Sequence, residues 1–206
     1  MHDAMLIPLW ADLIAVFTGA SQGTSLAIAE ERQALAPTGA FVLAVTTGLG
    51  GGMLRDVILN VRPAALQSSW YLAVVLAAVA TTWAIGHMTK ALSLVRPLDA
   101  AALGVYACAG ALKAEQAGLG VLGVLFVAVI ASTGGSVLRD VLLARVPLLM
   151  LPGELYAVPA LTSAVGFVVL SHLGLPLVLR FFVAAALGAG LRMLAMWRGW
   201  EMGRIR

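Results

Sequence analysis

Long apolar stretches, separated by short polar clusters, run through almost the whole chain. A helix needs about 20 mostly apolar residues to cross the hydrocarbon core of a bilayer, and seven stretches come close to that length or exceed it. They cover residues 6–29, 38–60, 69–88, 98–114, 119–144, 154–173 and 175–197. The apolar residues form continuous runs and do not alternate with polar ones. The pattern therefore predicts an all-α integral membrane protein with seven transmembrane helices.

Composition excludes several other classes of protein. Hydrophobic residues make up 61% of the chain and charged residues only 11%, and the mean hydropathy is +0.98. An ordinary soluble domain is about 45–50% apolar and about 25% charged. The net charge of +3 is spread over the loops without a basic stripe, so no nucleic-acid partner is expected. The single Cys108 permits no intrachain disulfide, and its apolar surroundings predict a buried, inert thiol.

A sequence repeat divides the chain. A shift of 84 positions aligns residues 50–63 with 134–147 and makes eight of the 14 pairs identical. Upstream, Asp12 and Gly23 align with Asp99 and Gly110 at a shift of 87. The repeat predicts a first three-helix unit at 1–88, a second at 89–173, and a seventh helix with a tail at 174–206. Because each unit crosses the membrane three times, the second must be inverted.

The distribution of Lys and Arg predicts the orientation in the cell membrane. Cytoplasmic loops carry an excess of basic residues. The loops after odd-numbered spans and the C-terminal tail hold seven: Arg32, Lys90, Arg96, Arg145, Arg198, Arg204 and Arg206. The opposite side holds Arg62 and Lys113. We therefore expect a multi-pass protein with its N-terminus outside and its C-terminus in the cytoplasm.

A small-residue cluster lies in the middle of the second and of the fifth predicted span. Consecutive glycines allow a helix to break, and freed carbonyl groups at membrane depth are tolerated where they line a polar cavity. Two clusters at matching positions favour broken helices that meet near the membrane midplane and offer oxygens to a cation. Close helix packing is the alternative. The clusters are Gly50, Gly51 and Gly52, and Gly134, Gly135 and Ser136.

Four hydroxyl residues precede these clusters. They are Thr46, Thr47, Ser132 and Thr133. Their oxygens could help to hold a partly dehydrated monovalent ion. Hydrogen bonding to their own helix is equally compatible with the sequence.

An Arg-Asp pair follows each cluster: Arg55-Asp56 and Arg139-Asp140. Ionisable residues within a span are costly and usually pair in the interior of the bundle. Neighbouring side chains on a helix diverge by about 100°, so we expect pairing across the repeats. Arg55 would then pair with Asp140, and Arg139 with Asp56. Such bonds could brace the structure or form part of a gate.

Three further ionisable residues accompany the repeat. Asp99 follows Arg96-Pro97-Leu98 and is expected to cap a helix, whereas the equivalent Asp12 either caps its helix or reaches the interior. Lys113 has Leu26 as its counterpart and could extend to the interface or act as a gating cation.

The sequence carries no recognisable catalytic motif. His2, His87 and His172 do not have metal-ligand spacing, and no Ser/His/Asp or HExxH pattern is present. No enzymatic activity, bound metal or cofactor is expected.

The motif GGG-x-x-RD from residue 50, its variant GG-x-x-x-RD from residue 134, and the layout of three, three and one spans resemble the prokaryotic TRIC (trimeric intracellular cation) channels. The resemblance implies a homotrimer in membrane lipid, without an obligatory protein partner. It implies a pore between the repeats of each protomer that conducts monovalent cations, chiefly potassium. It also implies helix kinks at both clusters and assigns Lys113 to the position of a basic residue linked to gating.

Two positions depart from the pattern of that family. Ser136 replaces a third glycine, and the first span reads Ala20-Ser21-Gln22-Gly23, where small residues alone are expected. A secondary transporter for a small solute such as glycine is the alternative function, because inverted repeats also describe that class. The Arg beside each intramembrane Asp favours the channel, since a proton-coupled carrier needs an acid without a nearby base.

Overall fold

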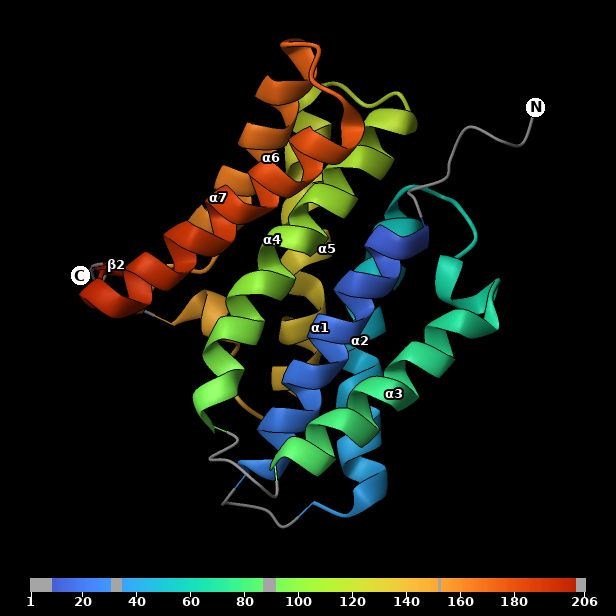
Figure 1. Cartoon of the computed structure of the whole chain (residues 1–206), viewed down its shortest axis with the longest axis vertical. Helices are drawn as coiled ribbons and strands as arrows, with labels where there is room; N and C mark the ends of the chain where they lie inside the picture. The colour runs from blue at the N-terminus through green and yellow to red at the C-terminus, as the bar shows by residue number, and fades with distance from the viewer. Residues whose placement is uncertain (1–8, 31–34, 87–91, 152, 203–206) are drawn as a thin grey trace.

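The computed structural model describes residues 9–30, 35–86, 92–151 and 153–202, which contain seven α-helices (Figure 1). They are α1 (Leu9–Ile28), α2 (Pro37–Ile58), α3 (Ser69–Gly86), α4 (Leu92–Gln116), α5 (Val121–Leu142), α6 (Ala157–His172) and α7 (Leu177–Arg198). Two 3-10 turns, η1 (Ala64–Leu66) and η2 (Leu148–Met150), follow α2 and α5. A short antiparallel pair joins β1 (Gly153–Glu154) to β2 (Glu201–Met202). The predicted all-helical fold with seven spans is confirmed.

The helices differ in how apolar they are. By length and composition, α2, α5 and α7 are each able to cross a membrane, and α3 and α6 contain shorter apolar helices. In α1 and α4, polar side chains such as Asp12, Gln22, Asp99 and Lys113 interrupt the apolar run, and all four are buried. Polar residues at membrane depth face the interior of a bundle. These two helices therefore bring the polar groups to the centre of the protein.

Helix α4 begins at Leu92, six residues before the predicted start, and Pro97 lies inside it. Proline at this position removes one intrahelical hydrogen bond, and α4 continues through it. Asp99 is consequently the eighth residue of α4, so the predicted helix cap at Asp99 is wrong.

The two repeats share local structure as well as sequence. Both ends of α5 lie 84 positions after those of α2, and the same shift relates η1 to η2. Asn60 and Ala144 correspond in the same way, and both have a left-handed backbone, with φ values of 52° and 50°. The local structure of the two repeats thus matches as far as the left-handed residue that follows each central helix.

Helices α2 and α5 continue without interruption through the small-residue clusters. The predicted breaks are therefore wrong, and the alternative, close helix packing, describes the observed role. A Cβ atom on Gly51 would overlap the carbonyl oxygen of Ala131, and one on Gly135 would overlap that of Thr47. These contacts are equivalent under the repeat. The glycines allow the two central helices to cross with their backbones in contact.

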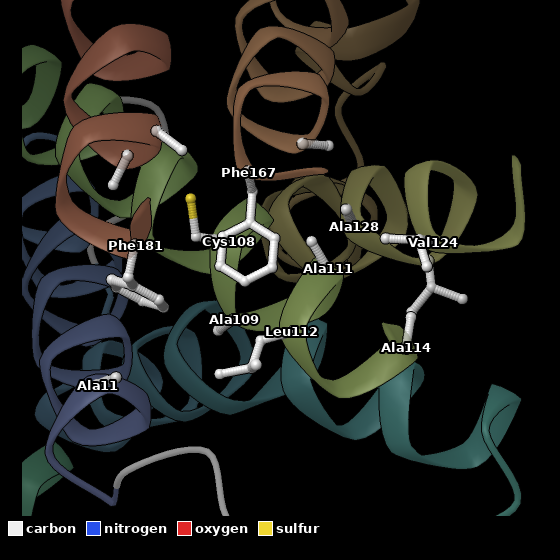
Figure 2. Close-up of a cluster of buried hydrophobic side chains, with 14 residues drawn as sticks. Ala11, Cys108, Ala109, Ala111, Leu112, Ala114, Val124, Ala128, Phe167 and Phe181 are labelled. Carbon is white, nitrogen blue, oxygen red and sulfur yellow. The ribbon is translucent and has the colours of Figure 1, made fainter. Parts of the chain in front are cut away.

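The largest apolar cluster joins α4 to α1, α5, α6 and α7 (Figure 2). Phe167 and Phe181 pack there against small side chains of α4, among them the buried Cys108. Helix α7 thus packs on the second repeat, while α3 packs on α1 and α2, at the opposite edge of the view in Figure 1. Large apolar side chains such as Leu122 and Phe126 cover the outer surface, as lipid contact requires.

Candidate functional site

Five buried residues from four helices form what we call the first cluster: Asp12, Arg55, Asp56, Tyr71 and Lys113. The Arg55 guanidinium lies 2.8 Å from Asp56 Oδ1 and 3.2 Å from Asp12 Oδ1. The Lys113 ammonium lies 2.7 Å from the same Asp56 oxygen. The Tyr71 hydroxyl donates to Asp12 Oδ2 at 2.8 Å.

The charges of the first cluster balance, with two carboxylates against two cations. Each of the four charged residues exposes 6% of its surface or less. Removing ions from water is expensive, and only close pairing with further hydrogen bonds offsets that cost. Lys113, which could have extended to the interface, is instead a buried partner of Asp56. The cluster therefore ties α4 of the second repeat to α2 of the first.

The second repeat builds a different set, which we call the second cluster: Gln22, Asp99, Tyr156 and Arg192. Asp99 Oδ1 accepts hydrogen bonds from the Gln22 amide and from the Tyr156 hydroxyl, the latter at 2.7 Å. Arg192 reaches Asp99 Oδ2 at 3.2 Å and stacks on the Tyr156 ring, 4.6 Å from its centroid. Asp99 is thus the centre of a buried network contributed by α1, α4, α7 and the start of α6.

The predicted charge pairs across the repeats are wrong. Arg139 lies 2.7 Å from its own neighbour Asp140, and Arg55 lies 2.8 Å from Asp56. Neither guanidinium pairs with the Asp of the other repeat. The long arginine stem is flexible enough to bring the guanidinium back to the adjacent carboxylate. Each carboxylate is also held by a backbone N–H eight residues later, from Ala64 or Leu148.

The two clusters correspond in part. Asp12 with Tyr71 matches Asp99 with Tyr156, and Arg192 from α7 binds Asp99 where Arg55 binds Asp12. Ser136 stands at the position of Gly52, and its hydroxyl lies 3.1 Å from the Tyr156 hydroxyl. Sequence reasoning missed Tyr71, Tyr156 and Arg192. The equivalent placement of the two tyrosines, early in the third and sixth spans, was the available signal.

The four predicted hydroxyl side chains all donate to carbonyl groups of their own helices. Thr46 and Thr47 bond to Val42 and Leu43, and both Ser132 and Thr133 bond to Val129. This is the ordinary role that the sequence left open. Each hydroxyl oxygen keeps its capacity to accept a hydrogen bond or contact a cation.

Two small cavities lie inside the helix bundle. Asp12, Gly48, Gly52 and Tyr71 line the first, which we call the Asp12 cavity. The second, the Asp99 cavity, is lined by polar groups that include Gln22, Thr47, Asp99, Ser132, Ser136 and Tyr156. Each has room for about one water molecule. Tyr106 lines both cavities, and its hydroxyl donates to the Gly48 carbonyl.

Comparisons with known proteins cover most of the chain. A family model described as "Glycine transporter" matches residues 9–87 and 97–172. A UPF0126 membrane protein of Deinococcus radiodurans is 34% identical over 161 residues, which are 75% of this chain and 72% of the relative. The UPF0126 inner membrane protein YadS of Escherichia coli K12 is 29% identical over 163 residues, 78% of this chain and 77% of the relative.

Solved structures agree in fold. One comes from work on the structural basis for conductance through TRIC cation channels. It superposes with a TM-score of 0.82 at 28% identity and covers 98% of both chains. The TRIC trimeric intracellular cation channel orthologue from Rhodobacter sphaeroides gives a TM-score of 0.84 at 27% identity and covers 93% of this chain and 97% of the orthologue.

Proposed function

Because this chain belongs to the prokaryotic TRIC channel family, whose family model bears the description "Glycine transporter", we propose that it conducts monovalent cations, chiefly potassium, across the cell membrane. The pathway runs inside each protomer, between residues 1–88 and 89–173. Helix α7, in the predicted third unit at 174–206, braces the second half through α4 and α6.

The two cavities inside the helix bundle carry this proposal. Hydroxyl, amide and carboxylate oxygens line the Asp99 cavity, and oxygen ligands can replace the water around a monovalent cation. The Asp12 cavity is lined by residues of α1, α2, η1 and α3 in the first repeat and by Tyr106 of α4. A route that joins them would cross the protein where α1, α2, α4 and α5 meet.

The charge pattern supports passive conduction. Each of the four intramembrane carboxylates lies within 3.2 Å of a guanidinium or ammonium nitrogen. A carrier coupled to protons needs an acid without a nearby base, whereas each of these four carboxylates is held in an ion pair. The paired carboxylates in the described residues therefore favour a channel.

Cavity size argues against glycine as the substrate. Each cavity has room for about one water molecule, which is close to the size of a dehydrated potassium ion. Zwitterionic glycine is several times larger and needs a cation for its carboxylate and an anion for its ammonium group. The Arg and Lys groups that could bind the carboxylate are already engaged by Asp side chains.

We propose further that the protein acts as a homotrimer in lipid, as the R. sphaeroides orthologue is described as trimeric. We also propose the predicted orientation, with the N-terminus outside and the C-terminus in the cytoplasm. Of the basic residues behind that orientation, Arg32, Lys90, Arg204 and Arg206 lie outside the described residues.

The deciding experiment reconstitutes the purified protein in liposomes with an outward potassium gradient and records potassium efflux. A parallel sample measures uptake of labelled glycine under sodium and proton gradients. Protein-dependent potassium flux without gradient-driven glycine uptake supports the channel. Saturable glycine uptake in the absence of potassium flux would replace it with the carrier.

A further inference from the structure

Tyr106 occupies an unusual position for a large side chain. It lies in the middle of α4, exposes 5% of its surface, and packs against Ala15 and Ala102. The shift of 87 that relates α1 to α4 aligns it with Gly19. The two repeats therefore place a phenol ring on one side of their interface and a hydrogen atom on the other.

The Tyr106 ring fits against the glycine that is its own counterpart. A Cβ atom on Gly19 would lie 2.9 Å from the Tyr106 hydroxyl oxygen and 3.0 Å from Cε2. Both distances are shorter than side chains normally tolerate. Gly19 thus leaves the space into which the ring of Tyr106 extends from α4 toward α2.

Tyr106 also lines both the Asp12 cavity and the Asp99 cavity. Its hydroxyl donates to the carbonyl oxygen of Gly48 on α2. Because α2 is helical through Gly48, this oxygen also serves the helix, and a carbonyl has two lone pairs. Release of the tyrosine bond would therefore leave no stranded acceptor.

From these contacts we infer that Tyr106 forms the constriction of the ion pathway and that its bond to Gly48 holds the constriction closed. This inference rests on the proposed channel function. Displacement of the ring joins the Asp12 cavity to the Asp99 cavity. The residue of the first repeat that corresponds to Tyr106 is Gly19, which has no side chain. Among the described residues, the second repeat alone therefore contributes such a barrier.

The first test compares potassium flux through Tyr106→Ala, Tyr106→Phe and the wild type in liposomes. Removal of the ring is expected to raise flux severalfold. Removal of the hydroxyl alone raises it less, because the ring remains. Phe126→Ala, which truncates an aromatic residue of α5 that is 64% exposed, is the matched control and leaves flux unchanged.

The second test introduces Tyr106→Cys together with Cys108→Ala and adds a small cationic thiol reagent. Modification at position 106 is expected to block flux, whereas the Cys108→Ala protein without the second change is unaffected. This experiment tests the role of Tyr106 even if the Tyr106→Ala protein is unstable.

The outcomes distinguish the proposed role of Tyr106 from the proposed channel function. Wild-type flux that Tyr106→Ala leaves unchanged, or thiol labelling at position 106 without block, overturns the role of Tyr106 and keeps the channel. Failure of the thiol at position 106 to react overturns it as well. If neither the wild type nor any variant conducts, the channel function itself is wrong.

Discussion

The ammonium group of Lys113 lies 2.7 Å from Oδ1 of Asp56, so a side chain of the second repeat neutralises a carboxylate of the first. The equivalent position in the first repeat is Leu26, and within the described residues no Lys or Arg of the first repeat pairs with a carboxylate of the second. The cation of this contact between the repeats therefore has no counterpart in the first repeat.

Replacement of Lys113 by Met tests this contact. The substitution keeps the length of the side chain but leaves Asp56 with Arg55 as its sole cationic partner in the first cluster. Loss of one partner from a buried ion pair costs about 3–5 kcal/mol of folding free energy. Because Arg55 remains beside Asp56, we expect a cost near the lower end of this range. Thermal unfolding in detergent should show a clearly lower midpoint. Arg145→Gln, which breaks a partly exposed pair with Glu30, should shift the midpoint little, and equal shifts would contradict the prediction.

Charge exchange distinguishes pairing within a repeat from pairing between repeats. Arg55→Glu places a third carboxylate beside Asp12 and Asp56 and should abolish or strongly reduce the folded yield. Asp12→Arg should restore part of that yield, because it returns a cation to the same contact. Asp140→Arg should restore none. The yield of monodisperse protein in detergent measures each case, and rescue by Asp140→Arg would reinstate the pairing across the repeats.

Much of the fold could be predicted from the sequence because two of its signals are local. A run of about 20 apolar residues is visible without knowledge of the neighbouring helices. A repeated string such as Leu54-Arg55-Asp56-Val57 identifies equivalent spans directly. An odd number of spans in each copy then requires the inversion.

The contacts of the candidate site could not be predicted in the same way. Arg192 reaches Asp99 from 93 positions away on a helix outside the repeat, and no local pattern marks that approach. The angle of about 100° between neighbouring side chains led to the wrong prediction of pairing across the repeats. That angle describes the directions of the Cβ atoms, whereas the long arginine stem can fold back to the adjacent carboxylate. The glycine clusters allow either a break or close packing, and only the position of Ala131 opposite Gly51 decides between them.

The crossing of α2 and α5 makes two neighbouring glycines respond differently to the same change. Gly51→Ala forces its methyl group onto the Ala131 carbonyl oxygen, which is backbone and cannot rotate away. Overpacking of this kind typically costs about 1–3 kcal/mol, and contact with backbone places it at the upper end. At Gly52 the nearest atom is Arg55 Nη2, 3.8 Å from the added Cβ, so Gly52→Ala should be neutral or slightly stabilising through helix propensity.

Thermal midpoints of the two alanine variants provide the measurement. Gly135→Ala repeats the clash against the Thr47 carbonyl oxygen and should behave like Gly51→Ala. A Gly51→Ala protein as stable as the Gly52→Ala protein would contradict the close contact between Gly51 and the Ala131 carbonyl oxygen.

Arg192 provides a test of the Asp99 cavity that depends on charge more than on shape. In Arg192→Met the Asp99 carboxylate keeps its hydrogen bonds from Tyr156 and Gln22 but loses the cation 3.2 Å away. An uncompensated negative charge at a cavity wall attracts cations, so potassium flux should saturate at a lower potassium concentration than in the wild type. Arg192→Lys keeps the charge and should retain the wild-type saturation. Arg180→Met, which breaks the pair between α7 and Glu115, should lower stability without changing saturation. If Arg180→Met shifts the saturating concentration as far as Arg192→Met does, the effect comes from a loosened α7, and the charge of Asp99 does not control access to the pathway.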